Sequence, residues 1–181
     1  MDQDKERSLI DEFLNGNERS FNELISNYQK NIYWHARRMM GNHFDADEIT
    51  QQVIIVLYKK LDTFRFQSSL KTWIYKITQT RCLNLLKKKK LKSFFNIDEA
   101  DNFIKNNNND IITNFEDKEK LERLNTILKE LPIKQREVFI FRHYDELSYE
   151  EISQITGKSI GGLKANYFHA SKKIFGMMEN E

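Results

Sequence analysis

A polar and basic segment near the C-terminus carries the clearest chemistry in the sequence. Residues 147–174 read LSYEEISQITGKSIGGLKANYFHASKKI, and from Lys158 on this segment contains lysines but no acid. Lysines contact phosphates, whereas amide and imidazole side chains hydrogen-bond to base edges, and Phe168 suits a thymine methyl. Helical spacing predicts one outward face, made of Lys158, Ser159, Gly161, Gly162, Lys164, Ala165, Asn166, Phe168, His169 and Lys172. Because small residues at the helix start allow close approach, this face is predicted to bind DNA.

Two capped helices joined by a glycine are predicted to position this face. Ser148 and Glu151 have the spacing of a capping box, and Ser159 stands where a second cap is needed. Gly157 supplies the left-handed residue of a sharp turn. The predicted inward residues are Leu147, Ile152, Ile155, Ile160, Leu163, Tyr167, Ala170 and Ile174. The pattern is that of a helix-turn-helix whose second helix enters a major groove; the alternative is a plain helical hairpin with solubilising lysines.

A second basic segment lies in the first half of the chain. Residues 71–92 contain eight basic side chains and no acidic one, and residues 98–122 are rich in acids. A single charge run is usually a solvated helix face. Two acid-free clusters on separate segments indicate a polyanion that is contacted at two places.

The elements that must carry these segments are predicted to be helices. One helix is expected over 20–41, opened by Ser20 and Glu23 and ended by Gly41. A second is expected over 45–64, capped by Asp45 or Asp47, and a third over 70–90 after the turn 65–69. For the third helix, the expected cap is Ser68 or Ser69.

The predicted fold class is all-α, with two small helical domains joined by a flexible linker. The domains are expected at 1–92 and 118–181, because the acidic segment 93–117 contains four consecutive asparagines and a mixed apolar pattern. One proline and six glycines in the chain argue against a turn-rich sheet protein. Pro132 fits the first turn of a helix in the second domain.

The composition argues against an enzyme, a metal protein or a membrane-spanning protein. The charged start of the chain does not look like a signal peptide and no apolar run could span a bilayer, so we expect a cytoplasmic protein. The single cysteine, Cys82, has no disulfide partner, and the four histidines lack the spacing of metal ligands. We therefore expect no cofactor, no metal, no catalytic residues and no small-molecule substrate.

Three motifs together resemble the extracytoplasmic-function (ECF) sigma factor family. The tail LPIKQREVFIFRHYDELSYEEISQITGKSIGGLKANYFHASKKI is similar to region four of that family. FDADEITQQVIIVLYKKLDTF resembles the polymerase-binding helix of region two, and SLKTWIYKITQTRCLNLLKKKK resembles the helix that follows it. The resemblance implies a bacterial transcription initiation factor that binds core RNA polymerase, recognises two promoter elements and assists DNA melting.

The resemblance also implies roles for individual residues. Glu48, Gln51 and Gln52 match the positions that dock on the β′ clamp of the polymerase, although the family usually has an acid where Gln52 stands. The residues matched to the minus-ten element are Phe64, Phe66, Ser68, Ser69, Lys71, Thr72, Tyr75, Lys76 and Gln79. From Lys71 on, these are expected on the solvent side of their helix, whereas Trp73 is expected in the core and Phe64 in either place.

The outward face of 158–172 matches the reader of the minus-thirty-five element. The family commonly has arginines where this chain has Asn166, His169 and Ser171, which implies a different preferred sequence. The implied partners are core RNA polymerase, through its β′ clamp and β flap, promoter DNA, and a membrane-bound anti-sigma factor. The alternatives are a one-component helix-turn-helix regulator that acts as a dimer without polymerase, and a small recombinase, for which arginines are sparse.

Overall fold

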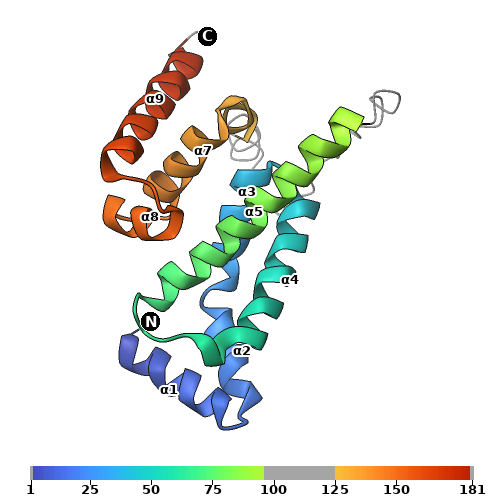
Figure 1. Cartoon of the computed structure of the whole chain (residues 1–181), viewed down its shortest axis with the longest axis vertical. Coiled ribbons are helices and arrows are strands. Elements are labelled where there is room, and N and C mark those ends of the chain that lie inside the picture. The colour runs from blue at the N-terminus through green and yellow to red at the C-terminus, as the bar shows by residue number, and fades with distance from the viewer. Residues whose placement is uncertain (1, 96–124, 180–181) are drawn as a thin grey trace.

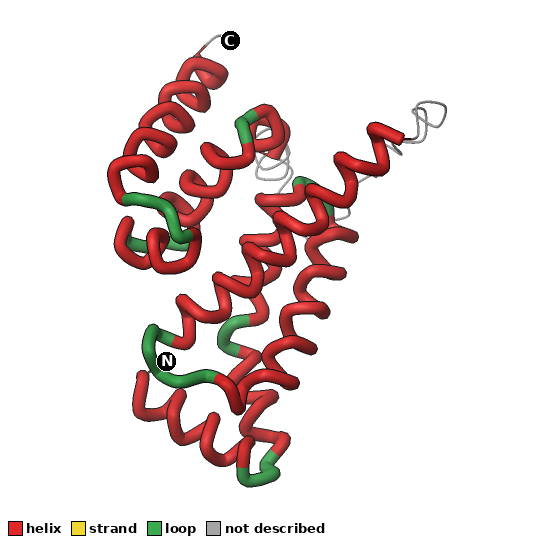
Figure 2. Tube along the Cα trace, viewed as in Figure 1, coloured by secondary structure: helices red, strands yellow, loops and turns green. Residues whose placement is uncertain are grey.

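The computed structural model describes residues 2–95 and 125–179, and every regular element within them is a helix (Figure 2). The elements are α1 (Gln3–Leu14), α2 (Glu18–Ser26), α3 (Gln29–Met40), α4 (His43–Lys60), the short 3-10 turn η1 (Leu61–Thr63), α5 (Leu70–Phe95), α7 (Ile133–Phe139), the π-helical turn η2 (Ile140–Tyr144), α8 (Tyr149–Thr156) and α9 (Ile160–Glu179). Residues 125–130 are also helical. The all-α prediction is confirmed, and the predicted linker 93–117 lies mostly outside the described residues.

Helices α1–α5 form the first domain around one apolar core. Leu24, Ile32, Met39, Ile49 and Leu57 are almost completely buried in it. Ile49 and Leu57 belong to the helix predicted over 45–64, so one side of that helix faces inward. Helix α5 is the long element of Figure 1, and it lies against both α3 and α4.

The single helix predicted over 20–41 is wrong, because the chain breaks at Asn27 and Tyr28 to give α2 and α3. The Asn27 amide donates to the Glu23 carbonyl at 2.7 Å, which competes with a continued helix. The Tyr28 hydroxyl hydrogen-bonds to the Glu6 carboxylate of α1. Tyr28 and Glu6 are 22 positions apart in the sequence, so no local pattern indicates that they bond.

The N-caps of α2 and α4 also differ from the prediction. Asn17 caps α2 through Arg19 N, whereas Ser20 is buried and donates to Glu12. Asn42, rather than either aspartate, caps α4 by accepting from Asp45 N at 2.9 Å. In both cases the N-cap is an asparagine just outside the apolar pattern, because the asparagine side chain readily accepts a hydrogen bond from a free N–H of the first turn.

The second domain follows the predicted helix-turn-helix closely. Ser148 and Glu151 form a complete capping box, and Gly157 ends α8 with φ 70°. Pro132 precedes α7 as its N-cap residue, and Gly41 of the first domain ends α3 with φ 75°. The local signals of the sequence therefore determine where these helices begin and end.

The two domains pack against each other (Figure 1). Helix α8 lies on α5, and η2 lies on α3. Ile140 of the second domain joins the apolar core of the first, and Tyr75 of the first joins the core of the second. None of the helices in the described parts of the chain is apolar over a length that would cross a bilayer.

Candidate nucleic-acid interface

The outward face of α9 is exposed as predicted. Leu163 and Ala170 anchor the helix in the second domain, and they are almost completely buried. The exposed residues of the predicted face are Ser159, Gly161, Gly162, Lys164, Ala165, Phe168, His169 and Lys172. Phe168 is 64% exposed, which is unusual for a large apolar side chain and leaves it available to a partner.

Two residues of this face are already engaged in the free chain. The Asn166 amide donates to the Gly162 carbonyl of its own helix at 2.7 Å, so it must turn outward to read a base. Lys158 pairs with Glu137 of α7 rather than pointing freely into solvent. Of the lysines, Lys164 and Lys172 are the fully exposed ones on this face, and the Lys164 ammonium lies 5.7 Å from the centre of the Tyr149 ring.

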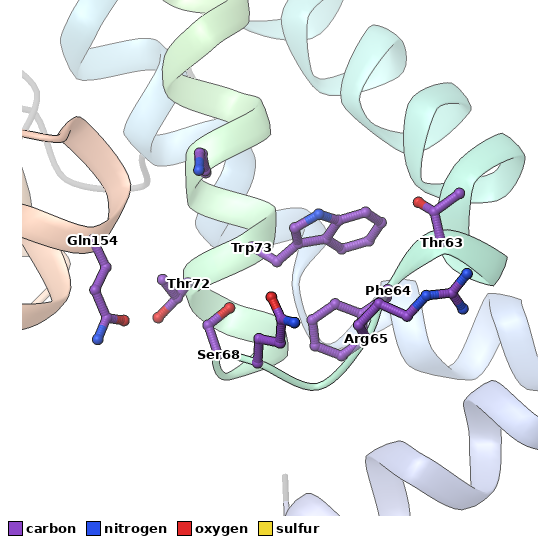
Figure 3. A pocket seen from close by; sticks show the side chains of 9 residues that line it. Thr63, Phe64, Arg65, Ser68, Thr72, Trp73 and Gln154 are labelled. Atoms are coloured by element: carbon purple, nitrogen blue, oxygen red, sulfur yellow. The ribbon is translucent and has the colours of Figure 1, made fainter.

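A pocket of about 440 Å³ opens beside the turn between η1 and α5 (Figure 3). The ring of Trp73 lies 5.1 Å from that of Phe64, and the two aromatic rings form one wall. The polar lining includes Ser68, Thr72 and, from α8 of the second domain, Gln154. Trp73 packs against the core, as expected, and the burial of Phe64 decides between the two places left open for it, while both rings also face the pocket. Aromatic walls with nearby hydroxyl and amide groups suit an unstacked base.

The turn that forms this pocket contains a strained residue. Phe66 has φ 55°, a left-handed conformation that a side chain with a Cβ rarely adopts. Its ring lies 4.8 Å from the Phe64 ring, and Arg7 of α1 covers it at 4.8 Å. The Ser69 hydroxyl accepts from Thr72 N at 3.1 Å and so caps α5. Tertiary contacts therefore hold the turn in place.

Three residues expected on the solvent side of α5 are buried. Thr72, Tyr75 and Gln79 are 4%, 2% and 3% exposed, because the second domain covers this face of the helix. Burial raises the pKa of the Tyr75 hydroxyl, and the nearby Asp145 carboxylate raises it further. Lys76 is exposed, as expected, and Lys71 is half-buried with its ammonium 3.3 Å from the Asp145 carbonyl. The expectation that Trp73 lies in the core is correct, but the helical periodicity of 70–90 gave no sign that the second domain covers another face of the helix.

A chain of buried polar groups crosses from one domain to the other. His35 Nδ1 lies 2.6 Å from the Asp145 carboxylate, and His35 Nε2 lies 3.1 Å from the Gln79 carbonyl oxygen. The Gln79 amide then donates to Glu137 at 2.5 Å, and Glu137 pairs with Lys158. Both ring nitrogens of His35 therefore have an oxygen atom as partner. Sequence analysis missed this network, since its members are 21 to 110 residues apart where they join.

The residues matched to polymerase binding lie together on α4. Glu48 and Gln51 are exposed, and the half-buried Gln52 donates to Glu48 at 2.9 Å. Phe44 and Ile55 are 65% and 53% exposed, and their spacing of 11 residues puts them on the same side of the helix. Sequence analysis did not identify Phe44 and Ile55. Apolar residues on the polar side of an amphipathic helix would have indicated a binding surface there. Together they make a mixed apolar and polar face that suits a protein partner.

No group of three or more His, Cys, Asp or Glu side chains within 2–95 and 125–179 is arranged to hold a metal ion. Cys82 is completely buried in the first domain, and this burial raises the pKa of its thiol.

Comparisons with known proteins agree with this division of the chain. Residues 24–92 match the family Sigma-70 region 2, and residues 121–174 match Sigma-70, region 4. Over 165 residues the chain is 28% identical to the ECF RNA polymerase sigma factor SigW of Bacillus subtilis, covering 87% of this chain and 88% of the relative. Over 173 residues it is 29% identical to the ECF RNA polymerase sigma-E factor of Escherichia coli, covering 92% and 90%.

One solved structure has the same overall fold. It is the sigma factor RpoE of Bartonella quintana in complex with the anti-sigma factor NepR, with a TM-score of 0.70 at 19% sequence identity. The match covers 90% of this chain and 99% of the other.

Proposed function

Because the chain belongs to the ECF sigma factor family, we propose that it binds core RNA polymerase and directs it to promoters by recognising two promoter elements. It is a transcription initiation factor rather than an enzyme, and its site of action is the cytoplasm. The main support for the proposal is that one chain contains two different surfaces that suit DNA. One is the exposed basic face of α9, and the other is the aromatic pocket next to α5.

The α9 face reads the minus-thirty-five element as duplex DNA. Exposed Lys164 and Lys172 contact phosphates, while His169 and Phe168 reach base edges in the major groove. Gly161 and Gly162 at the helix start allow the DNA backbone to come close. Because Asn166, His169 and Ser171 stand where the family commonly has arginines, this face makes few charge-assisted contacts to bases. Apolar and amide contacts therefore contribute a larger share of the sequence specificity.

The pocket beside α5 receives an unpaired base of the minus-ten element. The Phe64 and Trp73 rings supply the stacking surface, and Ser68 supplies a hydrogen-bonding group at the rim. Exposed Lys76 lines the same pocket and is placed to contact the adjacent phosphate. Thr72, Tyr75 and Gln79 extend this surface along α5 once the second domain has moved away.

The α4 face docks on the polymerase. Glu48, Gln51 and Gln52 provide polar contacts to the β′ clamp, and the exposed Phe44 and Ile55 add apolar area around them. The second domain contacts the β flap. An anti-sigma factor is a further proposed partner, as the structurally similar sigma factor of Bartonella quintana was solved in complex with one.

Reconstituted transcription tests the proposal. The purified chain should co-elute with bacterial core RNA polymerase, and together they should give transcripts from defined start sites that core polymerase alone does not produce. A variant with Ser68→Ala and Lys76→Ala, which line the same pocket without being buried, should keep polymerase binding but weaken open-complex formation. If core polymerase neither binds the chain nor changes its start sites, the proposal is wrong, and operator binding by a dimer without polymerase would favour the regulator instead.

A further inference from the structure

Glu137 bonds at the same time to one residue from each proposed DNA-reading surface. Its Oε1 accepts from the Gln79 amide of α5 at 2.5 Å, and its Oε2 pairs with the Lys158 ammonium at the turn before α9. Gln79 belongs to the proposed minus-ten surface and Lys158 to the proposed minus-thirty-five surface. The inference that follows rests on the function proposed above.

The contacts around Glu137 keep the minus-ten surface covered. Asp145 holds His35 of α3 at 2.6 Å, and its carbonyl accepts from Lys71 of α5 at 3.3 Å. Tyr75 is 2% exposed beneath the second domain. In this arrangement Tyr75 and Gln79 cannot contact DNA.

We propose that Glu137 is an intramolecular latch that couples binding of minus-thirty-five DNA to exposure of the minus-ten surface. In the free chain Glu137 bonds to Lys158 and Gln79 at the same time and holds the two domains together. A phosphate that captures Lys158 competes directly with the Glu137 carboxylate. Binding of DNA through Lys158 therefore disfavours the closed arrangement of the domains.

The burial of the two partners explains why the competition opens the domains. The Glu137 side chain is 3% exposed, whereas the Lys158 side chain is 32% exposed and can be reached from solvent. When Lys158 turns to a phosphate, Glu137 remains as a buried carboxylate without its cation, which is strongly unfavourable. The closed state loses stability, and separation of α8 from α5 lets water reach Glu137 and leaves Gln79 available to DNA.

The polar character of the contact makes this step reversible. His35, Gln79 and Lys71 on one side meet Asp145, Glu137 and Lys158 on the other. Each of these groups can bond to water after separation, although Ile140 and Tyr75 also make apolar contacts between the two cores.

Distance measurements between two spin labels test the latch without any DNA. Asn22→Cys on α2 and Lys134→Cys on α7 place labels on exposed positions outside the proposed DNA surfaces, and the buried Cys82 does not react. The otherwise unmodified chain should give one narrow distance distribution by pulsed electron spin resonance, that of the closed form. Glu137→Gln should raise the population outside this distribution about tenfold, since a neutral amide replaces the carboxylate to which Gln79 and Lys158 bond. The matched variant Glu130→Gln, at an exposed position, should leave the distribution unchanged.

A second variant guards against a folding defect in Glu137→Gln, which circular dichroism would reveal. Lys158→Gln removes the cation from a partly exposed position and imitates its capture by DNA. This variant should also open the domains. If both variants keep the closed distance while folded, the latch is overturned.

A binding experiment tests the coupling. Promoters mapped by transcription supply a labelled single strand with the minus-ten element and a duplex with the minus-thirty-five element only. With the unmodified chain, the duplex should strengthen binding of the single strand about tenfold, as linkage requires for such a latch. With Glu137→Gln, the single strand should bind tightly from the start and the effect of the duplex should fall to about onefold. An unchanged effect of the duplex in Glu137→Gln would overturn the coupling.

The two proposals fail in different ways. A chain that gives specific transcripts with core polymerase but keeps its closed distance in Glu137→Gln overturns the latch alone. A chain whose domains open in Glu137→Gln but which directs no transcription overturns the proposed function alone.

Discussion

Lys164 and Lys158 show how the same residue type on one helix-turn-helix acquires different roles. Lys164 is fully exposed above the Tyr149 ring, whereas Lys158 is paired with a buried carboxylate. A lysine that is free before DNA arrives contributes its phosphate contact without giving up another partner. A lysine that is paired contributes less, because binding must first break the existing ion pair.

Replacing Lys164 by alanine should weaken binding to duplex DNA with little dependence on sequence. Loss of one phosphate contact should reduce the slope of log K against log salt by about 1. Fluorescence anisotropy between low and moderate salt measures both quantities. Lys134→Ala, at an exposed position on α7, is the matched control and should leave the slope as it was; an equal loss in both variants would argue against a defined α9 surface.

At the scale of the element, the turn between α8 and α9 determines how the exposed face is presented. Gly157 has φ 70°, and the Ser148 cap accepts from Glu151 N at 3.1 Å. These two features fix both ends of α8. Nothing lies within 4 Å of a Cβ added at Gly157, so the constraint there is backbone conformation rather than space.

Gly157→Ala should destabilise the second domain by about 1 to 2 kcal/mol, the cost of a left-handed residue with a Cβ. Gly161→Ala is the matched control, because Gly161 lies in α9 with open space around it and without a positive φ. It should be neutral or stabilising, since alanine favours a helix. Thermal unfolding followed by circular dichroism compares the two, and equal melting temperatures would contradict the strain at Gly157.

The α4 face is the second element-scale feature with a testable role. Simultaneous replacement of Glu48, Gln51 and Gln52 by alanine should weaken binding to core polymerase at least about tenfold, the usual result of removing a central polar cluster. The fold should be preserved, as these side chains project from the surface. Surface plasmon resonance with immobilised core polymerase measures the effect, with the exposed Lys30→Ala on α3 as control. Unchanged affinity would remove this face from the proposed contact.

At the scale of the whole molecule, buried polar contacts hold the two domains together, along with the apolar contacts of Ile140 and Tyr75. The pair between His35 and Asp145 lies at the centre, with both side chains at most 4% exposed. Removing one partner of a buried pair typically costs 3–5 kcal/mol, about as much as such an interface can supply.

Asp145→Asn should therefore separate the domains without unfolding either. The expected results are a larger radius of gyration by small-angle X-ray scattering and two melting transitions in place of one. Glu146→Gln, at the neighbouring exposed position, should keep the compact form. A compact Asp145→Asn variant with one cooperative transition would show that apolar packing alone holds the domains.

The sequence by itself determined the features that depend on neighbours along the chain. The capping box of Ser148, the left-handed turn at Gly157 and the outward face of α9 all follow from residues within a few positions of each other. A helix hydrogen-bonds within its own segment, so its ends and its apolar side are encoded locally.

Only the tertiary structure decided what covers the polar side of α5 and where α2 gives way to α3. Tyr75 and Gln79 are polar residues on a face that periodicity assigns to solvent, yet the second domain buries them. Glu137, which accepts from Gln79, is 58 residues from it, and the Tyr28 hydroxyl bonds to Glu6 of a separate helix. Such contacts depend on how two finished surfaces fit together, and no short-range pattern contains that information.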